Sequence, residues 1–228
     1  DYAFTQATST APWVVYVHPG IYTEDLTLKP FVYVVGHPGS LGLMSNTRTV
    51  LIRGSHVTDN GGSSDNILLV NLTFEQLNAN TAAVLTHGTD GSLHIYRCRI
   101  AQSGVSPTQG PAILHSQGNL RLDESQVTHT TSGNATRYAL RVDGSSATIT
   151  EINRSVLSGP SVCLLNPGFY TDCVVSILDT QMDSTHASGK GIVSDASSLT
   201  VSYSTLSTAS GDAILVHPGA AVFNTDVE

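Results

Sequence analysis

One residue pattern recurs seven times in this chain and constrains its fold more than any other feature. The pattern is aliphatic, any, aliphatic, two further residues, small, any, aliphatic; Thr150 fills the first position in one copy, and the first copy ends with Leu72 and Phe74 at the small and last positions. Successive copies end 26, 27, 30, 25, 24 and 21 residues apart. A period near 25 residues over most of a chain indicates stacked supersecondary units. The copies end at Phe74, Ile100, Val127, Leu157, Met182, Leu206 and Val227.

Within each copy, the aliphatic spacing is that of a β-strand with one face turned inward. The two-residue gap before the small position breaks this alternation, so we expect a bend there. A second apolar stretch precedes each copy, and a glycine such as Gly88 or Gly118 usually follows it, supplying positive φ for a corner. Strands recurring in one direction must pair in parallel through right-handed connections. The sequence therefore predicts an all-β fold, a single-stranded right-handed parallel β-helix of about 8–9 turns, with no helix of useful length.

The repeat also predicts how the chain is organised. We expect residues 1–228 to form a single β-helix domain, with a lead-in at 1–12, first turns at 13–60 and the regular repeat at 61–228. The chain begins without an initiator Met and ends inside a motif. We therefore expect it to belong to a longer chain or assembly, in which a same-chain continuation or a protein partner covers the open C-terminal strand edge.

Two further columns follow from this register. The second corner residue alternates in charge over four copies, as Arg97, Glu124, Arg154 and Asp179. Opposite charges on neighbouring turns would contribute about 0.2–1 kcal/mol each. Each carboxylate would then be neutralised by its neighbours. The small position, which Cys98 fills in one copy, predicts a buried Ser/Thr/Cys ladder.

Composition excludes several classes of partner. The net charge is −8 with only ten Lys and Arg, which argues against binding to a nucleic-acid backbone. No apolar run approaches the roughly 18–20 residues that span a membrane.

Cys163 and Cys173 are near enough in sequence to form a disulfide, but strand geometry leaves their mutual orientation open. The sequons at Asn71, Asn134 and Asn153 would accept glycans in a secretory context.

The nine histidines do not predict a metal site. His18, His37 and His217 each precede Pro-Gly, as Asn166 does, so turn chemistry accounts for them. We place His87, His115 and His129 in loops or corners. There is no C-x-x-C pair. We therefore expect no metal and no cofactor.

The N-terminal part resembles a known family. Residues 13–24 (W-V-V-Y-V-H-P-G-I-Y-T-E), 32–36 (V-Y-V-V-G), 82–85 (A-A-V-L) and 96–100 (Y-R-C-R-I) carry the resemblance. They look like the opening turns of the pectin-lyase-like right-handed parallel β-helix superfamily, and pectin methylesterases are its nearest members. The resemblance covers about residues 13–100 and implies the β-helix fold.

The same resemblance argues against esterase activity. It implies two catalytic aspartates, a glutamine pair that stabilises the oxyanion, and an orienting arginine. The first glutamine position falls on Ala82, and residues 101–105 read A-Q-S-G-V where Q-D-T-L is expected. The D-F-I-F-G and L-G-R-P-W segments are absent. Loss of one oxyanion donor alone costs about two to three orders of magnitude in rate, so we assign no catalytic residue.

Neighbouring carboxylates do not replace that machinery. The pairs are Glu24/Asp25, Asp123/Glu124 and Asp179/Asp183, and adjacent strand residues point to opposite faces.

The leading hypothesis is a non-catalytic structural or receptor- or glycan-binding β-helix of a virion, phage tail (as in a tail spike) or cell surface, and hence an extracellular or virion-surface location. The alternative is a polysaccharide-active enzyme (an esterase, lyase or glycosidase) with a rebuilt site in the β-helix groove. A glycan ligand and a homo-oligomer both stay open.

Overall fold

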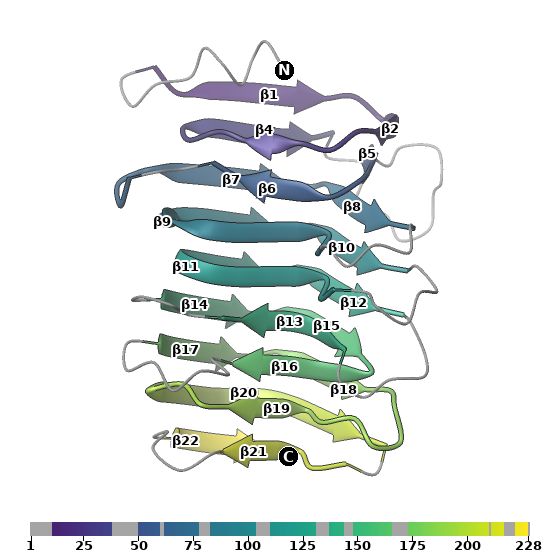
Figure 1. The fold of residues 1–228 in the computed structure, drawn as a ribbon, viewed down its shortest axis with the longest axis vertical. Coiled ribbons are helices and arrows are strands. Elements are labelled where there is room, and N and C mark those ends of the chain that lie inside the picture. Colours follow the sequence, from purple (N-terminus) through teal and green to yellow (C-terminus); the bar gives the residue numbers. More distant parts are fainter. Residues whose placement is uncertain are drawn as a thin grey trace.

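The structure is a computed structural model that describes residues 11–37, 50–59, 62–77, 83–103, 110–130, 137–143, 148–165, 173–209, 211–216 and 222–227. These residues form a parallel β-solenoid, so the predicted fold class is confirmed. Each turn contributes a strand to three ladders, and the strands lie across the long axis of the molecule (Figure 1). The described part of the chain contains no helix, and hence none that could cross a membrane.

The first ladder contains the leading strand of each repeat. Its members pair in parallel from the N-terminal to the C-terminal end. They are β1 (Trp13–Val17), β4 (Val32–Gly36), β7 (Asn66–Val70), the second half of β9 (Leu85–Tyr96), the second half of β11 (Ile113–Asp123), β14 (Thr148–Asn153), β17 (Cys173–Leu178), the first half of β20 (Ser198–Thr208) and β22 (Val222–Val227).

The second ladder follows the bend in each repeat. Its members are β2 (Gly20–Thr23), β5 (Val50–Arg53), β8 (Thr73–Gln76), β10 (Arg99–Gln102), β12 (Gln126–His129), β15 (Val156–Gly159), β18 (Gln181–Ser184) and the second half of β20.

The third ladder closes each turn. Its members are β3 (Thr27–Leu28), β6 (His56–Thr58), the first halves of β9 and β11, β13 (Tyr138–Val142), β16 (Ser161–Leu165), β19 (Ile192–Ser194) and β21 (Ile214–Val216).

The direction of winding is visible in Figure 1. The front strands β13 and β16 run to the left, whereas β14 and β17 run to the right behind them, and the chain descends from the N- to the C-terminus. Such a path is right-handed, as parallel crossover connections nearly always are.

The register of the repeat agrees with the predicted columns. The second aliphatic position stacks directly on its counterpart in the next turn. Burial of each such side chain stabilises the fold by roughly 1.5–3 kcal/mol. This column is wholly buried and consists of Leu69, Ile95, Leu122, Ile152, Ile177 and Val201.

The small position forms the predicted ladder. The backbone N–H of Cys98 donates to the Ser125 hydroxyl, that of Ser125 to Ser155, and that of Ser155 to Thr180. Each hydroxyl also donates to the carbonyl two residues earlier in its own turn. The small residues thus replace the backbone hydrogen bonds that the bend interrupts.

The bend itself uses left-handed backbone, which the sequence did not predict. We expected glycines to supply positive φ in the corners, and Gly118 does so at +78°. The corner column within the repeat, however, has φ between 47° and 56° although none of its residues is glycine. Its members are Asn71, Arg97, Glu124, Arg154, Asp179 and Tyr203.

The predicted charge alternation is confirmed over three turns. Glu124 accepts a hydrogen bond from Arg97 Nε at 2.7 Å and forms an ion pair with Arg154 Nη1 at 3.2 Å. The structure records no ion pair between Arg154 and Asp179, both of which it describes. The alternation therefore joins two arginines to one carboxylate.

The placement of three histidines in loops or corners was wrong. His87 lies in β9, His115 in β11 and His129 in β12, and all three are buried. The rings of His87 and His115 stack with their centroids 5.1 Å apart and their planes 3° from parallel. His115 aligns with Val142 of the next turn, whereas His129 aligns with the buried Gln102 of the preceding one.

The cysteines do not form the disulfide left open by the sequence. Cys163 in β16 and Cys173 in β17 are both free and buried. Burial raises the pKa of Cys163 to about 12, which keeps the thiol protonated and unreactive.

Candidate functional site

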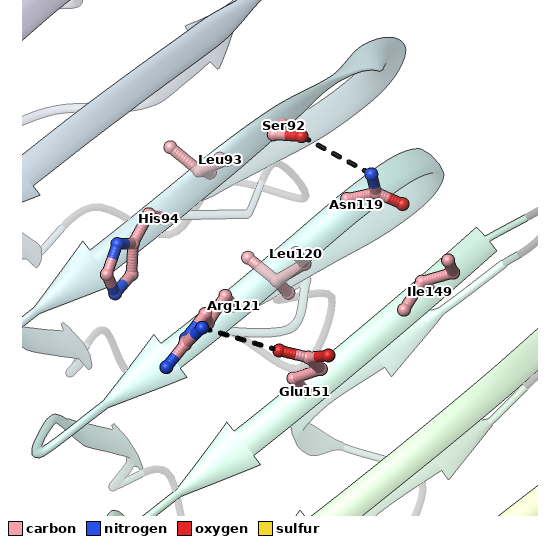
Figure 2. A pocket seen from close by; sticks show the side chains of 8 residues that line it. All are labelled: Ser92, Leu93, His94, Asn119, Leu120, Arg121, Ile149 and Glu151. Carbon is pink, nitrogen blue, oxygen red and sulfur yellow. Dashed lines mark hydrogen bonds and ion pairs between the residues drawn. The ribbon is translucent and has the colours of Figure 1, made fainter. Parts of the chain in front are cut away.

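A shallow groove on the outer face of the first ladder is the candidate functional site. It crosses β9, β11 and β14 and has a volume of about 240 Å³. Figure 2 shows its side chains on three successive parallel strands. We call it the first-ladder groove, and it is lined by Ser92, Leu93, His94, Asn119, Leu120, Arg121, Ile149 and Glu151.

Strand alternation places the polar side chains on the outside. Arg121 lies between the inward Leu120 and Leu122, so its own side chain points away from the core. His94 and Glu151 are its register partners on the neighbouring strands. A basic, an aromatic and an acidic side chain therefore lie side by side across the stack.

Arg121 is held between two carboxylates. Its Nε donates to Asp123 Oδ2 at 2.6 Å, and its Nη1 lies 3.8 Å from Glu151 Oε2. The side chain remains half exposed. The guanidinium thus has a fixed orientation and still offers N–H donors at the surface.

Asp123 lies two residues after Arg121 on the same face of β11 and orients the side chains of Arg121 and His94. Its side chain is buried, and it accepts hydrogen bonds from Arg121 Nε, His94 Nε2 and Asn153 Nδ2 at 2.6–3.0 Å. Burial alone would raise the pKa of Asp123, but the bonds from Arg121, Asn153 and His94 outweigh it and hold the pKa below its usual value. Asp123 therefore stays ionised at neutral pH.

This geometry suits binding better than bond cleavage. Glycoside hydrolysis needs one carboxylic acid that is protonated near neutral pH and a second, free carboxylate. Asp123 is ionised, and both of its oxygens already accept hydrogen bonds. The exposed groups that remain are the guanidinium donors of Arg121, the second ring nitrogen of His94, the amide of Asn119 and the carboxylate of Glu151. Asn119 Nδ2 also bonds Ser92 Oγ at 3.3 Å, which links the strands at the edge of the groove (Figure 2).

The structure separates the carboxylate pairs that the sequence suggested. Asp123 is bonded to Arg121 and His94 of the first-ladder groove, whereas Glu124 belongs to the corner column. Asp25 accepts a hydrogen bond from the Ser55 backbone N–H at 2.7 Å. Asp183 accepts one from its strand neighbour Gln181. Among the residues described, no three His, Cys, Asp or Glu side chains are grouped to hold a metal ion.

The positions compared with esterase residues lie elsewhere. Ala82, the counterpart of the first glutamine, falls outside the described residues. Gln102 lies at the end of β10 in the second ladder and is completely buried, away from the first-ladder groove. Of the three sequons, Asn134 also lies outside the described residues. Asn153 donates its amide to Asp123, so attachment of a glycan there would break that bond.

Sequence reasoning missed the first-ladder groove because its residues share no motif. His94, Arg121 and Glu151 are 27 and 30 residues apart and come together only through the register. The signal was nevertheless available, because all three occupy the position between the two aliphatic residues of the repeat. A comparison with family models, curated proteins and solved structures found no match to this chain.

Proposed function

We propose that this chain is a non-catalytic binding module that holds a glycan or a glycan-bearing receptor in its first-ladder groove. The observation that carries the proposal is the fixed guanidinium of Arg121 between Asp123 and Glu151. Sugar hydroxyls are bound by planar side chains that donate and accept at fixed angles. Arg121, His94, Asn119 and Glu151 provide such groups on one face.

The scaffold favours this function for a physical reason. Binding costs less when the receptor groups are already ordered. The cluster stands on three consecutive strands whose inward residues are buried, so little order has to be gained on binding. Remote kinship with the pectin-lyase-like β-helices, and with pectin methylesterases, agrees with this fold and is part of the proposal.

Such a module fits a virion, a phage tail or a cell surface, and an extracellular or virion-surface location. There, a protein partner or further copies of the chain would pair with an exposed edge strand of the solenoid. Detection of further copies of the chain in one particle would establish an oligomeric state.

The experiment is a binding measurement on a panel of neutral and acidic glycans that includes pectin. Isothermal titration should detect binding by the wild-type chain. Arg121→Ala should weaken it at least tenfold, because the oriented donors are lost. The matched control is Arg141→Ala, since Arg141 forms the same i, i+2 ion pair with Asp143 at 2.7 Å, but in the third ladder. Equal loss of binding in both variants, or no binding by the wild type, would refute the proposal.

A further inference from the structure

A buried arginine lies outside the first-ladder groove, and two of its side-chain nitrogens have no hydrogen-bond partner among the described residues. Arg137 precedes β13 and has only 7% of its surface exposed. Its Nε and Nη1 are buried and make no hydrogen bond within the described part of the chain. The structure records no ion pair for it either. A guanidinium with two donors deprived of both water and a hydrogen-bond partner is costly, and proteins almost always pair such donors.

Two neighbouring side chains have the same deficiency. Gln102 is fully buried, and both its Oε1 and its Nε2 are without a partner. His129, its register partner in β12, is buried with Nδ1 unpaired. Buried amide and imidazole groups are normally satisfied. Three unsatisfied polar side chains in one region therefore point to a missing ligand rather than to an isolated packing fault.

The protonation state of His129 determines which hydrogen-bond donors and acceptors this region presents to a ligand. Its Nε2 lies 3.2 Å from the Gly110 carbonyl and so carries the hydrogen. Burial, and to a smaller extent the nearby charge of Arg137, lower the pKa of His129 to about 4. Nδ1 is thus a free acceptor. The region presents cationic donors from Arg137, one acceptor from His129 and both kinds of group from Gln102.

An opening adjoins these residues. A hollow of about 420 Å³ lies at the corner after the second ladder, and His129 and Thr128 form part of its wall. Thr128 Oγ1 is also buried without a partner. Pro160 lines the same hollow, and the backbone N–H of the next residue, Ser161, donates to the Arg137 carbonyl at 2.9 Å. The Arg137 backbone therefore lies beside the hollow on the adjoining turn, and its charge acts on His129 in the wall of the hollow.

We propose that Arg137, Gln102 and His129 form a second binding site, for an oxyanion group that enters from the hollow. The oxyanion, a carboxylate or a phosphate, would pair with the guanidinium, which binds both in a two-pronged geometry. A hydroxyl beside the oxyanion would donate to His129 Nδ1. A sugar acid and a sugar phosphate both carry this combination. The inference is independent of the first-ladder groove.

The test is the thermal stability of the chain at pH 7 and constant ionic strength. Sodium galacturonate, sodium phosphate and neutral galactose are compared with sodium chloride. A ligand at ten times its Kd should raise Tm by about 4 °C. We expect a rise with galacturonate, with phosphate or with both, and none with galactose. The ligand that raises Tm shows whether the site binds a carboxylate or a phosphate.

Variants separate this site from general salt effects, because phosphate stabilises many folded proteins by exclusion from their surface. Arg137→Met replaces the guanidinium with an unbranched, uncharged side chain and should abolish the anion-specific rise. Arg141→Met, at an exposed and paired arginine, should retain it. An equal rise in both variants overturns the site. The absence of any anion-specific rise in the wild type overturns it too, whether or not Arg137→Met folds.

Discussion

The hydroxyl of Ser155 accepts a hydrogen bond from the backbone N–H of Ser125, 3.1 Å away on the preceding turn. It also donates to the Asn153 carbonyl at 2.8 Å. One small side chain thus satisfies a donor and an acceptor exactly where the strand bends and the regular ladder stops. The repetition of this contact explains why Ser or Thr fills this position in most copies of the repeat.

Removal of that hydroxyl should be costly. Ser155→Ala leaves the Ser125 N–H unsatisfied in the interior, whereas the Asn153 carbonyl keeps its bond from the Glu124 N–H, so the free energy of unfolding should fall by about 1–3 kcal/mol. Ser207→Ala is the control, because Ser207 is exposed and no hydrogen bond of its side chain is recorded. Urea denaturation measures both. Equal stability of the two variants would contradict the role of the ladder.

Thr150 should behave in the opposite way. It lies in a column whose neighbours are Leu120 and Val175, and its hydroxyl is buried without a partner. Thr150→Val keeps the shape and removes the unsatisfied group, so unfolding should cost about 1–2 kcal/mol more. The same urea denaturation experiment shows whether the free energy of unfolding rises or falls. A loss of stability would show that the Thr150 hydroxyl is hydrogen-bonded in solution.

The left-handed corner can be tested at Tyr203, which has a φ of 50° and is 76% exposed. Its side chain makes few contacts, so substitutions there report mainly on the backbone. Tyr203→Ile should lower the free energy of unfolding by about 1 kcal/mol, because a β-branched residue tolerates positive φ poorly. Tyr203→Asn should be neutral or stabilising, since Asn accepts this conformation. A reversed order would exclude the left-handed bend.

Acidification should unfold the chain through its buried histidines. Burial lowers the pKa of His87 to about 4 and, together with the charge of His87, that of His115 to about 3. The unfolded chain titrates near 6.5, so it binds more protons than the folded chain below that pH. The stabilisation is therefore present above pH 6.5 and is lost as the pH falls towards 4 and 3.

The size of this effect makes it measurable. A shift of two to three pH units corresponds to about 3–4 kcal/mol per histidine, against a typical stability of about 5–15 kcal/mol. Urea unfolding between pH 8 and pH 4 should show the loss, and His115→Leu should reduce its slope. The lowered pKa of Asp123 acts in a separate window, because its contribution is lost below about pH 4. A flat profile from pH 6.5 to 4.5 would contradict the buried histidine stack.

The columns of the fold were predictable from the sequence because each column repeats. Ile95 and Leu122 carry the strand alternation, and Ser125 carries the bend, so a period near 25 residues was enough to align them. The alternating charges of Arg97 and Glu124 were predictable for the same reason. These features depend on local chemistry that every turn reproduces.

The features that were missed occur once or depend on the surroundings of a side chain. His115 was placed in a loop or corner because a polar ring is rarely fully buried, and nothing local shows that it stacks on His87. The left-handed φ of Tyr203 was missed because glycine is the usual signal for such backbone. The orientation of Arg121 depends on Asp123, whose burial arises from the neighbouring turns. These properties are set by tertiary packing rather than by the pattern of one repeat.

The first-ladder groove is expected to bind a glycan without converting it to a product. The most direct measurement takes the glycan that binds most tightly, incubates it with excess wild-type chain, and quantifies methanol, new reducing ends and unsaturated products. We expect the wild-type chain and Arg141→Ala to bind the glycan and Arg121→Ala not to bind it. The glycan should be recovered intact. Release of any of these products by the wild-type chain, lost in Arg121→Ala, would contradict it and identify the groove as an active site.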